Sequence, residues 1–331
     1  LKKLKKGETD IVLLDIEMPG MNGLEFLKMR KELKIEVPVV MLSSLGATKP
    51  EVTIQALDLG AKDFIIKPSG SISLDLERVA NEIIASIKKY GGAKYHTSFD
   101  DKKIDDELKK LIESSPITVE SPKTPVFETM TQSKPILTPE KVSRGMDFIL
   151  IGISTGGPAA LRQLFGQLKP LKTPILIVQH MPPGFTKEFA KGLDKISSIR
   201  VKEAEDNELI KPSYAYIAPG NYHLSLKKRG LQFYTQLLET PPVNGHKPSV
   251  EVLFDSAFDL QTSVVGIIMT GMGKDGAHAL KKLHQQGNIT VAQSPKDCVV
   301  FGMPKVAVEL GGVDHILEID QIAQFLNNLE K

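Results

Sequence analysis

Cysteine is nearly absent from this sequence, which carries a single thiol, Cys298, among 331 residues. One cysteine excludes an internal disulfide framework and fits a reducing compartment. The apolar residues around Cys298 predict a buried, inert thiol. Long hydrophobic runs are absent too, since no stretch approaches the ~18 apolar residues of a membrane span. The first residues are charged with no apolar segment behind them and predict no signal peptide, so we expect a cytoplasmic protein.

A strong charge imbalance is also missing. The sequence has 42 basic and 40 acidic residues and a net charge of +2, so no global field points to nucleic acid or to membrane binding. The chain is long enough for two domains with sizeable cores. It begins without methionine, from which we expect that an N-terminal piece is missing.

Residues 1–90 alternate strand and helix patterns. Apolar runs at 11–14, 37–42 and 64–66 predict buried strands, and helical spacing follows each of them. Such a series predicts a parallel sheet with helices on both faces. Residues 91–145 are rich in Lys, Ser, Thr and Pro and predict a flexible linker. A second α/β domain is expected at 146–331, with strands at 148–153, 175–179, 264–269, 289–292 and 315–319.

Three polar residues stand at the ends of the expected strands of the first domain: Asp15, Ser43 and Lys67. In a parallel sheet they lie along the carboxyl edge, where such folds bind ligands. Asp15 could accept a phosphoryl group as a nucleophile, Ser43 could bond its oxygen, and Lys67 could neutralise its charge. Any one of them alone would be read as a cap or a solvated loop residue, but three together favour a phosphoryl site.

The stretch 13–23 (LLDIEMPGMNG), with 39–44 (VVMLSS) and Lys67, resembles the receiver domain of bacterial response regulators. The resemblance implies a flavodoxin-like fold, with Asp15 as the phosphorylated residue, Ser43 as the switch hydroxyl and Lys67 as the lysine that contacts the phosphate. It also implies Mg²⁺ for phosphorylation of the intact protein, held in part by acidic residues of a first strand.

This sequence begins just before what would be the third receiver strand. We therefore expect a receiver that lacks its first strands, an incomplete metal site, and no normal phosphorylation of this chain. In the strand order 2-1-3-4-5, the strand at 11–14 then becomes an exposed apolar edge, which is an aggregation risk.

The second domain is organised around residues 148–158 (FILIGISTGGP). The apolar run predicts a fully buried parallel strand, and helical spacing follows Pro158. Ser154 then sits on a tight strand-to-helix turn, which suits either a nucleophilic serine beside an oxyanion hole or a phosphate cradle. A nucleotide-binding fingerprint would need glycine at position 154 and an acidic residue ending the next strand, where the sequence has His180.

His180 and Asp275 are expected at the same edge of the sheet as Ser154. Ser154 and His180 belong to one strand–helix–strand unit, whose strands are usually neighbours about 4.8 Å apart. Asp275 follows a third strand through a glycine-rich loop. The spacing therefore predicts a Ser/His/Asp constellation. Its order along the chain differs from that of α/β-hydrolases, which argues for a separate fold.

Each member also has a simpler interpretation. Ser154 and Asp275 could be helix caps, and His180 could only satisfy a loop carbonyl. Four other histidines compete: His223 and His246, expected in loops, and His278 and His284, expected within a helix. We prefer His180 because it alone ends a strand adjacent to the serine strand.

Seven motifs of this domain are similar to the chemotaxis protein-glutamate methylesterase (CheB) family, which implies a Rossmann-like fold. They are 152–158 (GISTGGP), 179–185 (QHMPPGF), 215–220 (AYIAPG), 241–244 (PPVN), 248–250 (PSV), 270–276 (TGMGKDG) and 300–304 (VFGMP). The resemblance implies Ser154, His180 and Asp275 as a catalytic triad and main-chain donors near Thr155 and Met272 as the oxyanion hole. One departure is Gly245, where the family leads us to expect a basic residue.

The resemblance implies hydrolysis of glutamyl γ-methyl esters on methylated chemoreceptors, and deamidation of glutamine, without a cofactor for catalysis. A chemotaxis histidine kinase would be the phosphodonor, and neither nucleic acid nor membrane insertion is expected. The receiver would cover the catalytic cleft until Asp15 is phosphorylated, so a receiver lacking strands should leave this chain more active than the unphosphorylated intact protein. Because His180 must be neutral, activity should rise through roughly pH 6–7. Two other classes remain open, a docking module without hydrolysis and a signalling adaptor.

Overall fold

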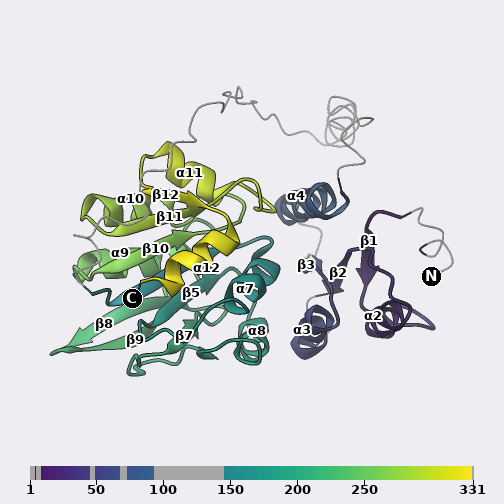
Figure 1. Ribbon diagram of the computed structural model, residues 1–331, viewed down its shortest axis with the longest axis horizontal. Helices are drawn as coiled ribbons and strands as arrows, with labels where there is room; N and C mark the ends of the chain where they lie inside the picture. The colour runs from purple at the N-terminus through teal and green to yellow at the C-terminus, as the bar shows by residue number, and fades with distance from the viewer. Residues whose placement is uncertain (1–3, 5–8, 45–48, 68–72, 93–144, 330–331) are drawn as a thin grey trace.

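The structure is a computed structural model that describes residues 4, 9–44, 49–67, 73–92 and 145–329. The linker predicted at 91–145 lies almost entirely outside the described residues. None of the described helices combines the length and the apolar character that a membrane span requires. The described elements form two parallel-sheet units. In Figure 1 the first unit is purple to blue and the second is teal to yellow.

The first unit alternates strands and helices as predicted. Its elements are β1 (Val12–Asp15), α2 (Gly23–Glu32), β2 (Val39–Ser44), α3 (Pro50–Asp58), β3 (Asp63–Lys67) and α4 (Ser73–Tyr90). The strands pair in parallel in the order β1-β2-β3. Among the described residues β1 is an edge strand and its Leu13 is 36% exposed, as expected of an apolar edge.

Local chemistry explains where two of these helices begin. Asn22 and Glu25 form a capping box at the start of α2, each side chain accepting a hydrogen bond from the other residue's backbone N–H. Pro50 opens α3, at the first helical position, where a missing N–H costs nothing.

The second unit is a seven-stranded, fully parallel sheet in the order β12-β11-β10-β4-β5-β7-β6. Its strands are β4 (Phe148–Ile153), β5 (Ile175–Gln179), β6 (Arg200–Glu203), β7 (Tyr214–Ile217), β10 (Val264–Ile268), β11 (Ile289–Gln293) and β12 (His315–Leu317). Its helices are α7 (Gly157–Phe165), α8 (Phe185–Asp194), α9 (Val250–Asp259), α10 (Ala277–Gln285), α11 (Met303–Glu309) and α12 (Ile319–Asn327). The central strands β4, β5 and β10 are buried throughout, which explains their continuous apolar runs. The α/β class predicted for both units is confirmed.

Four strands were not predicted from the sequence. They are β6, β7, and the antiparallel hairpin of β8 (His223–Arg229) and β9 (Gln232–Leu238). They are short or largely polar. In β6 only Val201 is buried, and the second half of β8 runs into exposed basic residues. The expectation that His223 lies in a loop is wrong, because it is the first residue of β8 and is fully buried.

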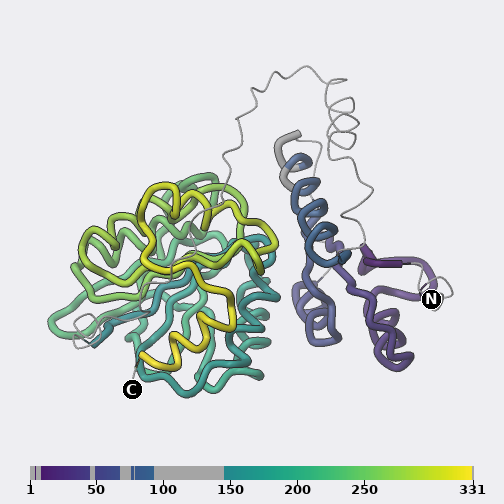
Figure 2. Tube along the Cα trace, turned by 45° about the horizontal axis from the view of Figure 1, so that its top comes forward, coloured from purple at the N-terminus to yellow at the C-terminus, as the bar shows by residue number. Residues whose placement is uncertain are grey.

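The two units pack against each other. Figure 2 shows α3 and α4 on the side of the first unit that faces the second. Helix α3 lies against α8, the rings of Phe64 and Phe185 stack 5.9 Å apart, and Arg162 is 2.9 Å from Asp58. One hydrophobic cluster contains residues of both units.

Candidate active site

Ser154 lies between the end of β4 and the start of α7. Its backbone N–H donates to the carbonyl of Thr270 (2.9 Å), and its carbonyl accepts from Gly157 N–H (2.8 Å). Gly156 has φ of +80°, and a Cβ there would lie 2.4 Å from a methyl group of Val299. Only glycine fits this turn without strain, so the sequence holds Ser154 on the tight strand-to-helix turn that was predicted.

His180 follows β5 and lies beside Ser154. The pairing of Ile153 with Gln179 places the next residues of β4 and β5 side by side, and His180 N–H donates to the Ile153 carbonyl (3.2 Å). The buried Gln179 amide donates to the carbonyls of Ser154 (3.0 Å) and His180 (3.2 Å). Gln179 therefore ties together the two backbone segments that carry these side chains, a role that the sequence analysis did not assign.

Asp275 meets His180 at this edge. It arrives through the loop that leads from β10 to α10, its side chain is 1% exposed, and its Oδ2 is 2.9 Å from His180 Nε2. The structure thus brings together the histidine and the aspartate that spacing predicted. No hydrogen bond links Ser154 Oγ to His180 among the described residues, whereas Nδ1 of His180 is buried without a partner there.

Several donors surround the Asp275 carboxylate. Ser249 Oγ (2.7 Å) and Asn244 Nδ2 (2.9 Å) donate to Oδ1, and Val250 N–H at the start of α9 donates to Oδ2 (2.7 Å). Burial alone would raise the pKa of Asp275, but the hydrogen bond and charge of His180, with Asn244 and Ser249, lower it to about 2. Asp275 is therefore a carboxylate that can only accept hydrogen bonds.

Asn244 and Ser249, which donate hydrogen bonds to Asp275, were not predicted to be site residues. A signal existed in Asn244-Gly245, because this dipeptide is typical of a tight hairpin turn that could aim a side chain. Ser249 directly precedes α9 and reads as an ordinary cap, although its side chain makes no capping bond. It donates to Asp275 instead.

The four other histidines considered as alternatives to His180 differ in where they lie relative to the site. His223 Nε2 is 3.0 Å from the Pro241 carbonyl and its Nδ1 accepts from Ser249 N–H (3.1 Å), so it supports the segment that holds Asp275. His278 and His284 lie in α10 as predicted. His246 lies face to face with His180, with ring centroids 3.8 Å apart and planes inclined by 9°.

The segments that carry Thr155 and Met272 both border Ser154. A Cβ on Gly271 would lie 2.7 Å from Ser154 Cβ, so the loop before Asp275 touches the serine closely. Thr270 Oγ1 donates to the Thr155 carbonyl (2.9 Å) and ties the two segments together. The backbone N–H groups of Thr155 and Met272 donate no hydrogen bond within the described residues, which leaves both available to a ligand.

The first unit touches the turn after Ser154. Thr155 Oγ1 donates to Glu82 of α4 (3.5 Å), and Lys89 Nζ donates to the Lys296 carbonyl (2.9 Å). Asp63 of β3 is buried and accepts a hydrogen bond from the backbone N–H of Phe64 (2.8 Å), and the backbone N–H of Gly156 also acts to lower its pKa. Burial, and to a smaller extent the charge of Glu82, raises the pKa of Asp63 to about 7.

Asp15 and Lys67, whose strand positions predicted a place at one edge of the first sheet, form an ion pair there. Burial opposes ionisation of Asp15, but Lys67 and backbone N–H groups outweigh it and lower the pKa of Asp15. Ser43 is buried and its hydroxyl is 2.9 Å from Thr53 Oγ1. Within the described residues no group of three acidic, histidine or cysteine side chains could hold a metal ion.

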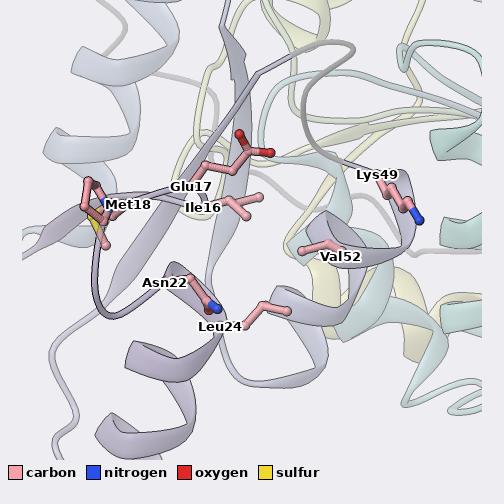
Figure 3. Close-up of a pocket in the computed structure, with 8 residues that line it drawn as sticks. Ile16, Glu17, Met18, Asn22, Leu24, Lys49 and Val52 are labelled. Atoms are coloured by element: carbon pink, nitrogen blue, oxygen red, sulfur yellow. The ribbon is translucent and has the colours of Figure 1, made fainter.

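A cavity of about 670 Å³ lies between the loop after β1 and the start of α3. Figure 3 shows Ile16, Leu24 and Val52 on its apolar side, with Glu17 and Lys49 among the residues around it.

Cys298 lies in the other unit and is buried, as predicted, and burial raises the pKa of its thiol to about 12.

The two units together define a class of protein. A parallel α/β domain presents a serine, a histidine and an aspartate at one edge of its sheet, and a second parallel α/β unit presents an aspartate–lysine pair. This combination is typical of a hydrolase domain with a parallel α/β fold, distinct from the α/β-hydrolase fold, that is joined to a receiver unit. Residues 149–326 match the CheB methylesterase family and residues 1–77 match the response regulator receiver domain.

The chain belongs to the CheB methylesterase family. The protein-glutamate methylesterase/protein-glutamine glutaminase of Treponema denticola is 46% identical over 333 residues, which cover 100% of this chain and 88% of that protein. A protein of the same description from Pectobacterium atrosepticum is 42% identical and covers 97% of this chain and 83% of its own length. The crystal structure of the Thermotoga maritima CheB methylesterase catalytic domain matches with a TM-score of 0.54 and 40% identity, over 56% of this chain and 99% of that chain.

Proposed function

We propose that this chain hydrolyses γ-methyl esters of glutamyl residues in chemoreceptors and deamidates glutamine with the same apparatus. The observation that carries the proposal is the buried His180–Asp275 pair, 2.9 Å apart, beside Ser154 at the edge of the sheet. The names of the relatives, protein-glutamate methylesterase/protein-glutamine glutaminase, support the substrate class.

The hydrogen bonds assign a role to each ring nitrogen. Because the Asp275 carboxylate can only accept, Nε2 of His180 carries the proton between them. Nδ1 of the neutral ring then has a free lone pair, and in this mechanism it takes the Ser154 hydroxyl proton. Ser154 Oγ attacks the ester carbonyl carbon, and the backbone N–H groups of Thr155 and Met272 stabilise the oxyanion that forms.

For the tetrahedral intermediate to collapse, the proton that His180 took from Ser154 must be transferred to the leaving oxygen. Methoxide is a poor leaving group, so His180 returns the proton as the carbon–oxygen bond breaks and methanol departs. Water then attacks the acyl-enzyme, His180 takes a proton from that water, and the same proton regenerates the Ser154 hydroxyl. With glutamine as substrate, ammonia leaves in place of methanol. The proposal needs no cofactor for catalysis.

We also propose that phosphorylation of Asp15 by a chemotaxis histidine kinase regulates this site in a protein whose receiver has its complete metal site. The contacts of Glu82 with Thr155 and of Asp63 with Gly156 support the idea, because they fall on the turn that carries the nucleophile and an oxyanion donor. The unphosphorylated receiver would restrain this turn and limit access to it. The Asp15–Lys67 pair supports the position of the phosphoryl group.

Covalent labelling tests the enzyme against a docking module and against a signalling adaptor. A fluorophosphonate probe should modify the full chain at Ser154, as located by peptide mass spectrometry, and Ser154→Ala should abolish the labelling. Ser263→Ala is the matched control and should be labelled like the wild type. Ser263 directly precedes β10, at the end of the sheet opposite to Ser154. No labelling of Ser154 in a folded wild-type chain would favour the non-catalytic classes.

A further inference from the structure

The turn formed by Val243, Asn244, Gly245 and His246 lies against both His180 and Asp275. The N–H groups and carbonyls of Val243 and His246 pair with each other at 3.0 and 3.1 Å. Asn244 and Gly245 have φ of +52° and +77°, the left-handed conformation that two-residue hairpin turns require and that Asn-Gly favours. The local sequence therefore dictates this turn.

The turn presents two side chains to the site. Asn244 Nδ2 donates to Asp275 Oδ1 (2.9 Å), and the His246 ring covers one face of His180 at a centroid distance of 3.8 Å. His180 is thereby fixed in two directions, at its edge by Asp275 and on its face by His246. With its side chain 8% exposed, little of the ring remains open to water.

We infer that His246 is a positioning residue for His180, holding the plane of the imidazole while it takes and returns the Ser154 proton. The inference rests on the proposed function and deepens it. Both proton transfers need the same ring orientation, and a misplacement of about 1 Å can cost on the order of 10²-fold in rate. A stacked ring supplies that restraint without itself taking or giving a proton.

A ring at position 246 also affects the protonation of His180. The titratable groups around His180 are Asp275 at its edge, His246 on its face, Glu251 behind Asp275, and Glu82 of the first unit near Thr155. A phenyl face attracts a cationic ring more strongly than an imidazole face does. His246→Phe should therefore keep the stack but move the pH at which activity is lost.

The test uses the full chain, methylated chemoreceptors as substrate and methanol release as readout, with His246→Ala and His246→Phe. We expect kcat to fall about tenfold in His246→Ala with KM unchanged, and to recover to within about threefold of wild type in His246→Phe. The acid limb of the kcat/KM profile should move up by about half a pH unit in His246→Phe. His278→Ala, at an exposed position of α10, is the control and should match the wild type.

Three outcomes would overturn the inference: a kcat of His246→Ala within twofold of wild type, a loss confined to KM, or a His246→Phe variant no better than His246→Ala with an unmoved acid limb. Failure of the proposed function would look different. In that case wild type and Ser154→Ala would release methanol equally slowly, and no variant at position 246 would change it.

Discussion

Asp275 is the residue on which the geometry of the site converges. It accepts hydrogen bonds from His180, Asn244, Ser249 and the first backbone N–H groups of α9. These bonds keep it charged in a buried place, where an unpaired carboxylate would be costly. The carboxylate can therefore orient His180 and stabilise its protonated form.

Replacing Asp275 with Asn keeps the volume of the side chain and removes its charge. We expect kcat to fall by about 10⁴, because the amide cannot stabilise the imidazolium and favours the wrong tautomer. Single-turnover methanol release measures the effect. A loss of less than tenfold in a folded variant would contradict the role assigned to Asp275.

Asp275 also predicts a pH dependence of stability. Its pKa is lowered from an ordinary value near 4 to about 2 in the folded chain, so its contribution is fully present above pH 4 and is lost as pH falls toward 2. The free energy of unfolding of wild type should exceed that of Asp275→Asn by about 2 kcal/mol at pH 7. Urea denaturation should show this difference narrowing below pH 4, and a difference that stays constant down to pH 3 would refute the account.

At the scale of elements, the long apolar strands were predictable and the polar ones were not. β4, β5 and β10 are buried on both faces, so their sequences carry an unmistakable run of aliphatic residues. β6 and the β8–β9 hairpin are short or partly exposed, so polar residues interrupt their sequences and no continuous apolar run marks them. The core of the sheet could therefore be predicted from the sequence, whereas the edge formed by β7 and β6 could not.

The site residues also divide into those that the sequence could predict and those that it could not. Ser154, His180 and Asp275 follow strands whose order could be reasoned from connectivity, so their meeting at one edge could be predicted. Asn244 and Ser249 reach Asp275 from a segment without a strand pattern, and Asp63 and Glu82 come from the other unit. Such contacts depend on tertiary packing, which periodicity does not encode.

The contact of β3 with the start of α7 predicts a second pH effect, of opposite sign. The pKa of Asp63 is raised to about 7, so the folded chain keeps a proton that the unfolded chain loses above pH 4. Stability therefore falls as pH rises from 4 to 7. Asp63→Asn should remove this slope and be more stable than wild type at pH 8, on the order of 2 kcal/mol.

Denaturation of the Asp63→Asn variant and of wild type at pH 5 and pH 8 measures this effect. The two proteins should differ least at pH 5. Equal stabilities at pH 8 would show that Asp63 does not hold a proton at this contact.

At the scale of the whole molecule, the interface between the two units predicts how activity is restrained. Asp58 of α3 lies 2.9 Å from Arg162 and 3.9 Å from Lys195. Such exposed pairs are worth little individually, but a reversed charge would face two cations. Asp58→Lys should therefore loosen the interface and raise the basal methylesterase rate several-fold in the unphosphorylated chain.

Glu205→Lys is the matched control for that experiment. It reverses a charge at an exposed ion pair with Lys202 near the far edge of the sheet, and its basal rate should equal that of wild type. A rate of Asp58→Lys equal to that of the control would argue that the contact with the first unit does not limit the site.

In the proposed mechanism Ser154, activated by His180 and Asp275, attacks and cleaves a glutamyl methyl ester. The decisive experiment compares methanol release from methylated chemoreceptors by the full chain and by Ser154→Ala. We expect wild type to release methanol stoichiometrically with loss of receptor methyl groups, and Ser154→Ala to be slower by about 10⁶. A folded Ser154→Ala variant that releases methanol at the wild-type rate would contradict the account.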